Sequence, residues 1–187
     1  MSRPALAALR STVAASPTAA ARARLGTALL RAGETREAER ELRAALDLDP
    51  GCVGAWVNLG GILLARWDFQ GAVEANRAAA LADPALAVAH FNQGLAHLHL
   101  GEAERAAECL GRAIELEPRQ AAAYHHLGVA LGALGRPAEA RLCLAYAEEL
   151  GAVPRRPPFE PLDRVTHARA GDAPKGSQSG SSPPPQE

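Results

Sequence analysis

The sequence predicts an all-α solenoid of four stacked helix-turn-helix repeats, with an N-terminal capping helix and a disordered C-terminal tail. The prediction depends on small residues and prolines that recur at a spacing of 34. The recurring residues are Gly26, Gly60, Gly94 and Gly128, then Ala38, Ala72, Ala106 and Ala140, and finally Pro50, Pro84 and Pro118. A fixed period of this length is typical of proteins built from stacked repeats.

The repeats occupy residues 19–52, 53–86, 87–120 and 121–152. In each repeat, apolar residues return at intervals of three and four on both sides of a break, which predicts two helices of about 14 residues. Gly33, Gly101 and Gly135 stand in three of these breaks, whereas Trp67 occupies the equivalent place in the second repeat. The sequence leaves open whether the second turn has a different backbone.

Glycine at the same place in four predicted helices indicates close contact between helices. A glycine inside a helix costs about 1 kcal/mol relative to alanine, so its recurrence needs a packing reason. Two polar residues interrupt this pattern of packing. Asn76 stands where other repeats have leucine, and Gln93 also replaces a leucine. We expect either local looseness or a specific hydrogen bond at these positions.

The two ends of the chain differ from the repeats. Ala5, Leu9 and Val13 match the second helix of a repeat at an offset of 33, so residues 1–18 are predicted to form a capping helix over 4–15. The alanine-rich, arginine-containing composition of this segment leaves a targeting sequence as the alternative. Residues 153–187 are rich in proline, glycine and serine, and they are predicted to be mostly disordered, with an extended polyproline-like stretch at 154–162.

Composition argues against several classes of function. A net charge of −1 gives no general attraction to nucleic acid or to an acidic membrane. Three cysteines, an odd number, favour a reducing compartment, and we expect a cytoplasmic protein. The sequence shows no phosphate loop, zinc signature or nucleophile motif. We therefore expect no enzyme activity, no cofactor and no metal.

The repeat pattern resembles the tetratricopeptide repeat. The resemblance is carried by Trp56, Leu59 and Gly60 near the start of the second repeat, by the recurring alanines, and by the closing Pro84. It implies that the first helix of each repeat lines a concave groove. Asn58 and Asn92 are similar to the groove asparagines of O-linked N-acetylglucosamine transferases, although the catalytic domain of those enzymes is absent here.

Charge is distributed unevenly between the helices of the repeats. The first helices, at 19–32, 53–66, 87–100 and 121–134, contain no Asp or Glu. The second helices are acidic, and we interpret Glu37, Glu39, Glu41, Glu104 and Glu108 as a solvated outer surface. These features predict a peptide-binding groove formed by Arg24, Asn58, Phe91, Asn92, Leu95 and His126.

The sequence therefore predicts a scaffold or adaptor that binds an extended peptide segment of another protein. Three alternatives stay open. The groove could hold the chain's own tail, with Phe159 as the anchor, or a second copy in a homo-oligomer. The chain could also be a secretion-type chaperone for a client protein.

Overall fold

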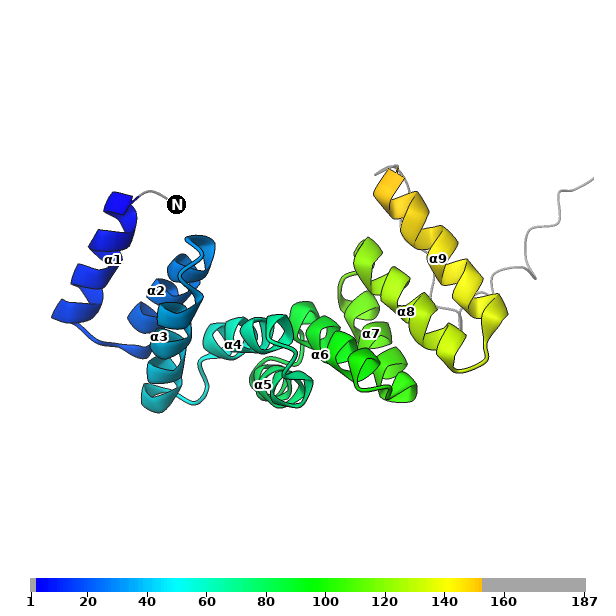
Figure 1. The fold of residues 1–187 in the computed structure, drawn as a ribbon, viewed down its shortest axis with the longest axis horizontal. Helices are drawn as coiled ribbons and strands as arrows, with labels where there is room; N and C mark the ends of the chain where they lie inside the picture. The colour runs from blue at the N-terminus through cyan, green and yellow to red at the C-terminus, as the bar shows by residue number, and fades with distance from the viewer. Residues whose placement is uncertain (1–2, 153–187) are drawn as a thin grey trace, which may run out of the picture.

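The computed structural model describes residues 3–152 of the chain, and this range consists of nine helices without strands. The predicted tail at 153–187 lies outside the described residues. The helices are α1 (Arg3–Ala15), α2 (Ala19–Arg31), α3 (Thr35–Leu48), α4 (Val53–Ala65), α5 (Phe69–Ala82), α6 (Ala87–His99), α7 (Ala103–Leu116), α8 (Ala121–Ala133) and α9 (Pro137–Ala152). The predicted α-solenoid is confirmed, and Figure 1 shows its helices following one another along an arc.

The first helices of the repeats lie on the inner side of this arc. Each first helix packs against the second helix of its own repeat, as in the pairs α2–α3 and α6–α7. First helices of successive repeats also touch one another, in the pairs α2–α4, α4–α6 and α6–α8, whereas the second helices α3, α5, α7 and α9 make no such contacts among themselves. Closer approach on one side bends the stack toward the first helices, and α5 lies outside α4 (Figure 1).

Helix α1 covers the first repeat, as the offset of 33 predicts. Its Leu6 and Val13 are buried in one cluster with Leu25 and Leu29 of α2. Beside this apolar face, the guanidinium of Arg10 forms ion pairs of 2.8 Å with Glu34 and with Glu37 of α3. The capping helix therefore buries an apolar face that the first repeat would otherwise expose.

The recurring glycines mark places where a side chain of the second helix touches the backbone of the first. A Cβ added to Gly94 would lie 2.5 Å from Leu110 Cγ, and one added to Gly128 would lie 2.8 Å from Leu144 Cγ. In the second repeat, the Asn76 amide occupies this place against Gly60. Glycine is thus required by the close approach of the paired helices.

All four turns within the repeats have the same backbone. Gly33, Gly101 and Gly135 have φ values of 81°, 76° and 71°, and Trp67 has a φ of 66°. The following amide also repeats its hydrogen bond, as Asp68 N–H donates to Leu63 O at 3.0 Å and Glu102 N–H donates to His97 O at 2.9 Å. The second turn therefore does not differ, and Trp67 adopts a left-handed conformation that costs an L-residue about 1–2 kcal/mol.

We expect Gly94→Ala to lower the free energy of unfolding by about 1–3 kcal/mol, because the added methyl group overlaps Leu110. Gly111→Ala in α7 is the matched control. A Cβ there meets nothing within 4 Å, and replacing a helical glycine stabilises by about 0.5–1 kcal/mol. Urea denaturation followed by circular dichroism measures both changes. Equal effects of the two substitutions would contradict the close-contact explanation.

The turns give a second prediction about stability. We expect Gly101→Ala to lower the free energy of unfolding by about 1–2 kcal/mol, because alanine strains the left-handed backbone and has no compensating contact. Trp67→Gly should leave the free energy unchanged within about 1 kcal/mol, since relief of strain offsets the loss of ring contacts. A larger loss for Trp67→Gly than for Gly101→Ala would show that Trp67 stabilises the fold.

Candidate functional site

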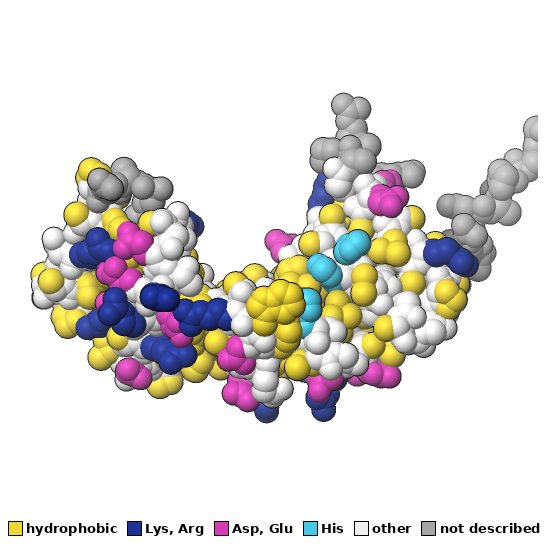
Figure 2. Space-filling view, in the orientation of Figure 1, with side chains coloured by type: hydrophobic (Ala, Val, Ile, Leu, Met, Phe, Trp, Pro, Cys, Tyr) yellow, Lys and Arg dark blue, Asp and Glu magenta, His cyan; other side chains and the backbone are white. Residues whose placement is uncertain are grey.

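The molecule is hollowed on the side lined by the first helices. In Figure 2 the hollow lies between the two ends of the arc, and histidine side chains gather on one of its walls. Helices α4 and α6 lie at the bottom of the hollow in Figure 1. Because α2, α4, α6 and α8 contain no Asp or Glu, these inner helices contribute no carboxylate to it.

Asn58 connects the first two inner helices. Its Nδ2 donates hydrogen bonds to Thr27 Oγ1 of α2 at 2.9 Å and to Gly54 O of its own helix at 2.8 Å. Asn58 thus joins α4 to α2 through its amide donors, while its Oδ1 has no donor within residues 3–152.

Asn92 belongs to a chain of amides that runs between α6 and α5. Its Nδ2 donates to Asn76 Oδ1 at 3.2 Å, and Asn76 Nδ2 donates to Ala72 O at 2.8 Å. Asn76 is completely buried, and its amide is satisfied on both sides. Of the two outcomes expected for Asn76, the structure shows the specific hydrogen bond.

The pairing of Asn76 with Asn92 is a feature that sequence reasoning missed. One signal was available, because Asn76 departs from leucine in the repeat that directly precedes the one carrying Asn92. A buried amide needs a partner, and a polar residue at a neighbouring inner position is the natural one.

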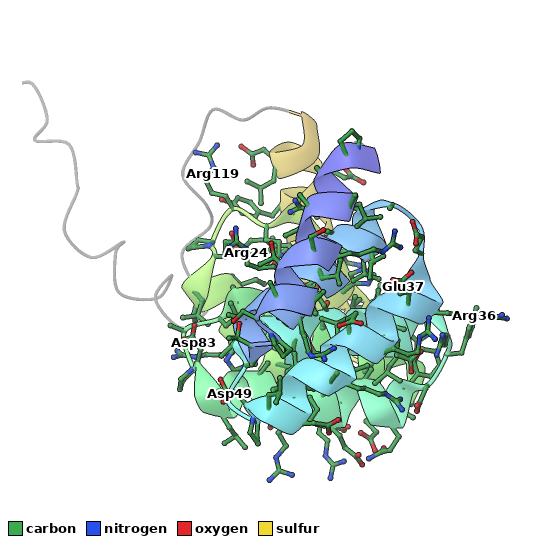
Figure 3. All side chains as sticks on the ribbon, turned by 90° about the vertical axis from the view of Figure 1, so that its left-hand side faces the viewer. Arg24, Arg36, Glu37, Asp49, Asp83 and Arg119 are labelled. Atoms are coloured by element: carbon green, nitrogen blue, oxygen red, sulfur yellow. The ribbon has the colours of Figure 1, made fainter. Side chains whose placement is uncertain are left out.

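Arg24 lies at the α1 end of the hollow. Together with Arg31 it lines an open pocket of about 360 Å³ between α1, α2 and α4, whose other lining residues are Leu9, Ala23, Thr27, Ala28 and Gly54. Both arginines are exposed, and neither forms an ion pair with an acid in residues 3–152. Figure 3 shows Arg24 on the opposite side of the molecule from Glu37. This end of the hollow is therefore basic.

Phe91 and His126 lie together on the wall formed by α6 and α8. Their ring centroids are 5.9 Å apart, and both side chains are half-buried. Phe91 packs into the clusters around Ile114 and Leu110, so much of its surface serves the core. Burial lowers the pKa of His126 below its ordinary value of 6.5, and the nearby His125 and His99 lower it further.

The accessible apolar surface here belongs partly to residues outside the predicted set. Val88 of α6 exposes 37% of its surface and Val129 of α8 exposes 47%, whereas Leu95 is half-buried. The structure thus brings Phe91, Leu95 and His126 to one wall and Arg24 to the far end, with Asn58 and Asn92 between them on α4 and α6.

The acids of the second helices are more organised than a solvated surface. Glu41 pairs with Arg22 of α2 at 2.8 Å, Glu37 pairs with Arg10 of α1, and Glu39 pairs with Arg66 at the end of α4. The interpretation of these three acids as simply solvated was wrong. Helix α3 packs against α2 and α4, and the Arg10 side chain reaches it from α1. Its acids therefore pair with arginines of three neighbouring elements, while Glu104 and Glu108 are exposed.

A further polar contact in this part of the molecule involves His97. It is buried, and its Nδ1 lies 2.6 Å from Glu102 Oε2, a contact that lowers the pKa of Glu102. This pair joins the end of α6 to the start of α7. Residues 3–152 contain no group of three His, Cys, Asp or Glu side chains placed to hold a metal ion.

Two of the cysteines pack as small apolar groups. Burial raises the pKa values of the Cys109 and Cys143 thiols, which fits this packing.

Within residues 3–152, none of the helices has the length and apolar character needed to cross a membrane.

Comparison with known proteins agrees with the repeat pattern. A sequence model described as a tetratricopeptide repeat matches residues 23–87, and a second, described as a TPR repeat, matches residues 94–135. The chain is therefore a protein that carries tetratricopeptide repeats, as its resemblance to them predicts. No sequence among curated proteins matches it.

Several solved structures share the fold. A crystal structure of MamA is 25% identical, with a TM-score of 0.71 over 79% of this chain and 86% of that chain. A second MamA crystal structure is 25% identical, with a TM-score of 0.70 over 78% and 80% of the two chains. A MamA structure from Desulfovibrio magneticus RS-1 is 24% identical, with a TM-score of 0.71 over 79% and 84%.

The lowered pKa of His126 predicts how stability depends on pH. The unfolded chain takes up a proton near the ordinary pKa of 6.5, whereas the folded chain takes it up only at lower pH. The stability associated with His126 is therefore complete above pH 6.5 and is lost as the pH falls toward the folded pKa. We expect His126→Gln to flatten the pH dependence of the free energy of unfolding between pH 7.5 and about 5. Parallel profiles for the two proteins would contradict this assignment.

Proposed function

We propose that the chain is a protein-interaction scaffold that binds an extended peptide segment of a partner protein in the hollow over α2, α4, α6 and α8. The single observation that carries this proposal is the contrast between the inner and outer helices. The four inner helices present amides, histidines and accessible valines without any carboxylate, while the acids of residues 3–152 lie on the outer helices and in the turns. Curved repeat arrays use such concave surfaces for binding.

The polarity of the hollow indicates which peptides it accepts. Arg24 and Arg31 have no acidic partner among the described residues, so they favour an acidic group of the peptide at the α1 end. Asn58 Oδ1 can accept a hydrogen bond from a peptide N–H farther along. At the α6–α8 wall, Val88 and Val129 offer apolar contact. An extended segment with acidic residues toward one end and apolar residues toward the other fits this order.

The residues that test the proposal should not hold the fold together. Asn58 and Asn92 donate hydrogen bonds within the protein, and Phe91 packs into its core, so their substitution would alter stability as well as binding. Val129 is better suited because it is exposed on an inner helix. Leu142 of the outer helix α9 is a matched control, as the two side chains expose 47% and 51% of their surface.

We expect Val129→Glu to weaken peptide binding at least tenfold, because it places a carboxylate and removes an apolar contact inside the hollow. Leu142→Glu should change affinity less than twofold. Peptides selected on the full chain from a displayed library would be synthesised and titrated by fluorescence anisotropy against the folded variants. Equal affinities for the two variants would contradict binding in the hollow.

A second matched pair examines the basic end. Arg24→Glu should discriminate against acidic peptides, whereas Arg77→Glu on the outer helix α5 adds the same charge change at another exposed position. If both substitutions reduce affinity equally, net charge and not the position of Arg24 governs binding.

A further inference from the structure

Three aromatic rings, two of them exposed and the third half-buried, form a cluster where the turn between α4 and α5 meets the end of α6. We call Trp67, Phe69 and His99 the rim cluster. The rings of Phe69 and His99 are stacked, with centroids 4.4 Å apart and planes 3° from parallel. Trp67 meets both edge-on, with centroid distances of 5.9 Å to Phe69 and 6.2 Å to His99. His99 follows Asn92 by two helical turns, so the cluster continues the inner face of α6 to its rim.

Trp67 is the unexpected member of this cluster. It adopts the left-handed backbone that glycine supplies in the other three turns, and 75% of its surface stays exposed. Backbone strain of this kind persists where the surrounding structure imposes it, and it gathers at binding sites. Although the ring touches Phe69 and His99, three-quarters of its surface stays free for contact with a partner.

The sequence contains a segment with the chemistry to cover these rings. Residues 154–161 read PRRPPFEP, and they follow the last described helix directly. Proline-rich segments are recognised by exposed aromatic rings, because a polyproline helix is stiff before it binds. Charge is also complementary at one position, since Asp68 of the turn can attract Arg155 or Arg156, whereas Glu102 already contacts His97 and Arg105. Arg66 beside Trp67 is already paired with Glu39.

The chain's geometry prevents the prolines and arginines at 154–158 from reaching the rim cluster of their own molecule. The turns within repeats lie at one edge of the solenoid and the turns between repeats lie at the other. Figure 3 shows Arg36 and Glu37 at the first edge and Asp49, Asp83 and Arg119 at the second.

Helix α9 begins at the edge of the solenoid that carries the rim cluster and ends at the opposite edge. Its 16 residues span about 24 Å from one edge to the other. From Ala152, the six residues to Pro158 extend at most about 20 Å. Since α7 and α8 also separate α9 from α6, residues 154–158 cannot reach the rim cluster of their own molecule.

We propose that residues 154–161 of one molecule bind the rim cluster of a second copy. Because the segment and the cluster are different surfaces, the contact is head-to-tail, and each bound molecule keeps one free segment or one free cluster. Such contacts form open chains or rings of copies. The proposal does not depend on the hollow of α2, α4, α6 and α8. A test of peptide binding in the hollow and a test of this contact therefore give independent results.

Two full-length variants remove the two surfaces separately. Trp67→Gly installs the residue that the other three turns contain, so the turn should be preserved. The triple variant Pro154→Ser, Pro157→Ser and Pro158→Ser alters residues beyond the end of α9. Analytical ultracentrifugation over increasing concentration measures the mass of each protein alone and of an equimolar mixture.

We expect wild type to grow beyond the monomer mass of 19.5 kDa as its concentration rises, and each variant alone to stay at that mass. The mixture should form a heterodimer and stop there. In that complex the Trp67→Gly chain supplies the segment and the triple variant supplies the cluster, and no second contact can form. A labelled synthetic peptide of residues 153–163 should bind the triple variant at least tenfold more tightly than it binds Trp67→Gly.

Three results would overturn the proposal. The first is wild type that stays monomeric at all concentrations, and the second is a mixture that stays monomeric while wild type associates. The third is association that Trp67→Gly abolishes but the triple variant retains, since the cluster would then bind another surface of the second copy.

Discussion

In every repeat, a side chain of the second helix packs against the backbone of a glycine in the first helix, and this contact determines the structure of the repeat. Leu42, Leu110 and Leu144 lie against Gly26, Gly94 and Gly128, with no space for a β-carbon between them. This contact sets the separation of the paired helices. The completely buried alanines Ala38 and Ala106 lie at the same interface, so the paired helices meet through leucine packed against glycine and alanine.

The second repeat keeps this contact but changes its chemistry. Asn76 replaces the leucine against Gly60, and a buried amide must find hydrogen-bond partners. It finds them in Ala72 O and in Asn92 of the next inner helix. A substitution in the core thereby fixes the side chain of a residue in the hollow. The interior of the second repeat and the candidate binding surface of the third are coupled through one pair of amides.

The inner and outer helices also differ in charge, because the inner helices carry arginines and histidines but no acids. Arginines of α1, α2 and α4 pair with acids of α3, and these ion pairs join neighbouring elements at the first repeat. Arg24 and Arg31 are left without such partners among the described residues and line a pocket at the end of the hollow. The uneven distribution of acids thus stabilises contacts between outer and inner helices and leaves the hollow neutral to basic.

The sequence by itself determined the helices, the repeats and the side of the array on which the acids lie. These features follow from spacing along the chain, and a period of 34 in small residues repeats the same local structure each time. Only the tertiary structure decided how side chains from different helices meet. Asn76 pairs with Asn92 across 16 residues, and Trp67 meets His99 across 32, because stacking brings their helices together. The same applies to the turn at Trp67, whose left-handed backbone is imposed by the packed helices on both sides against the preference of the residue itself.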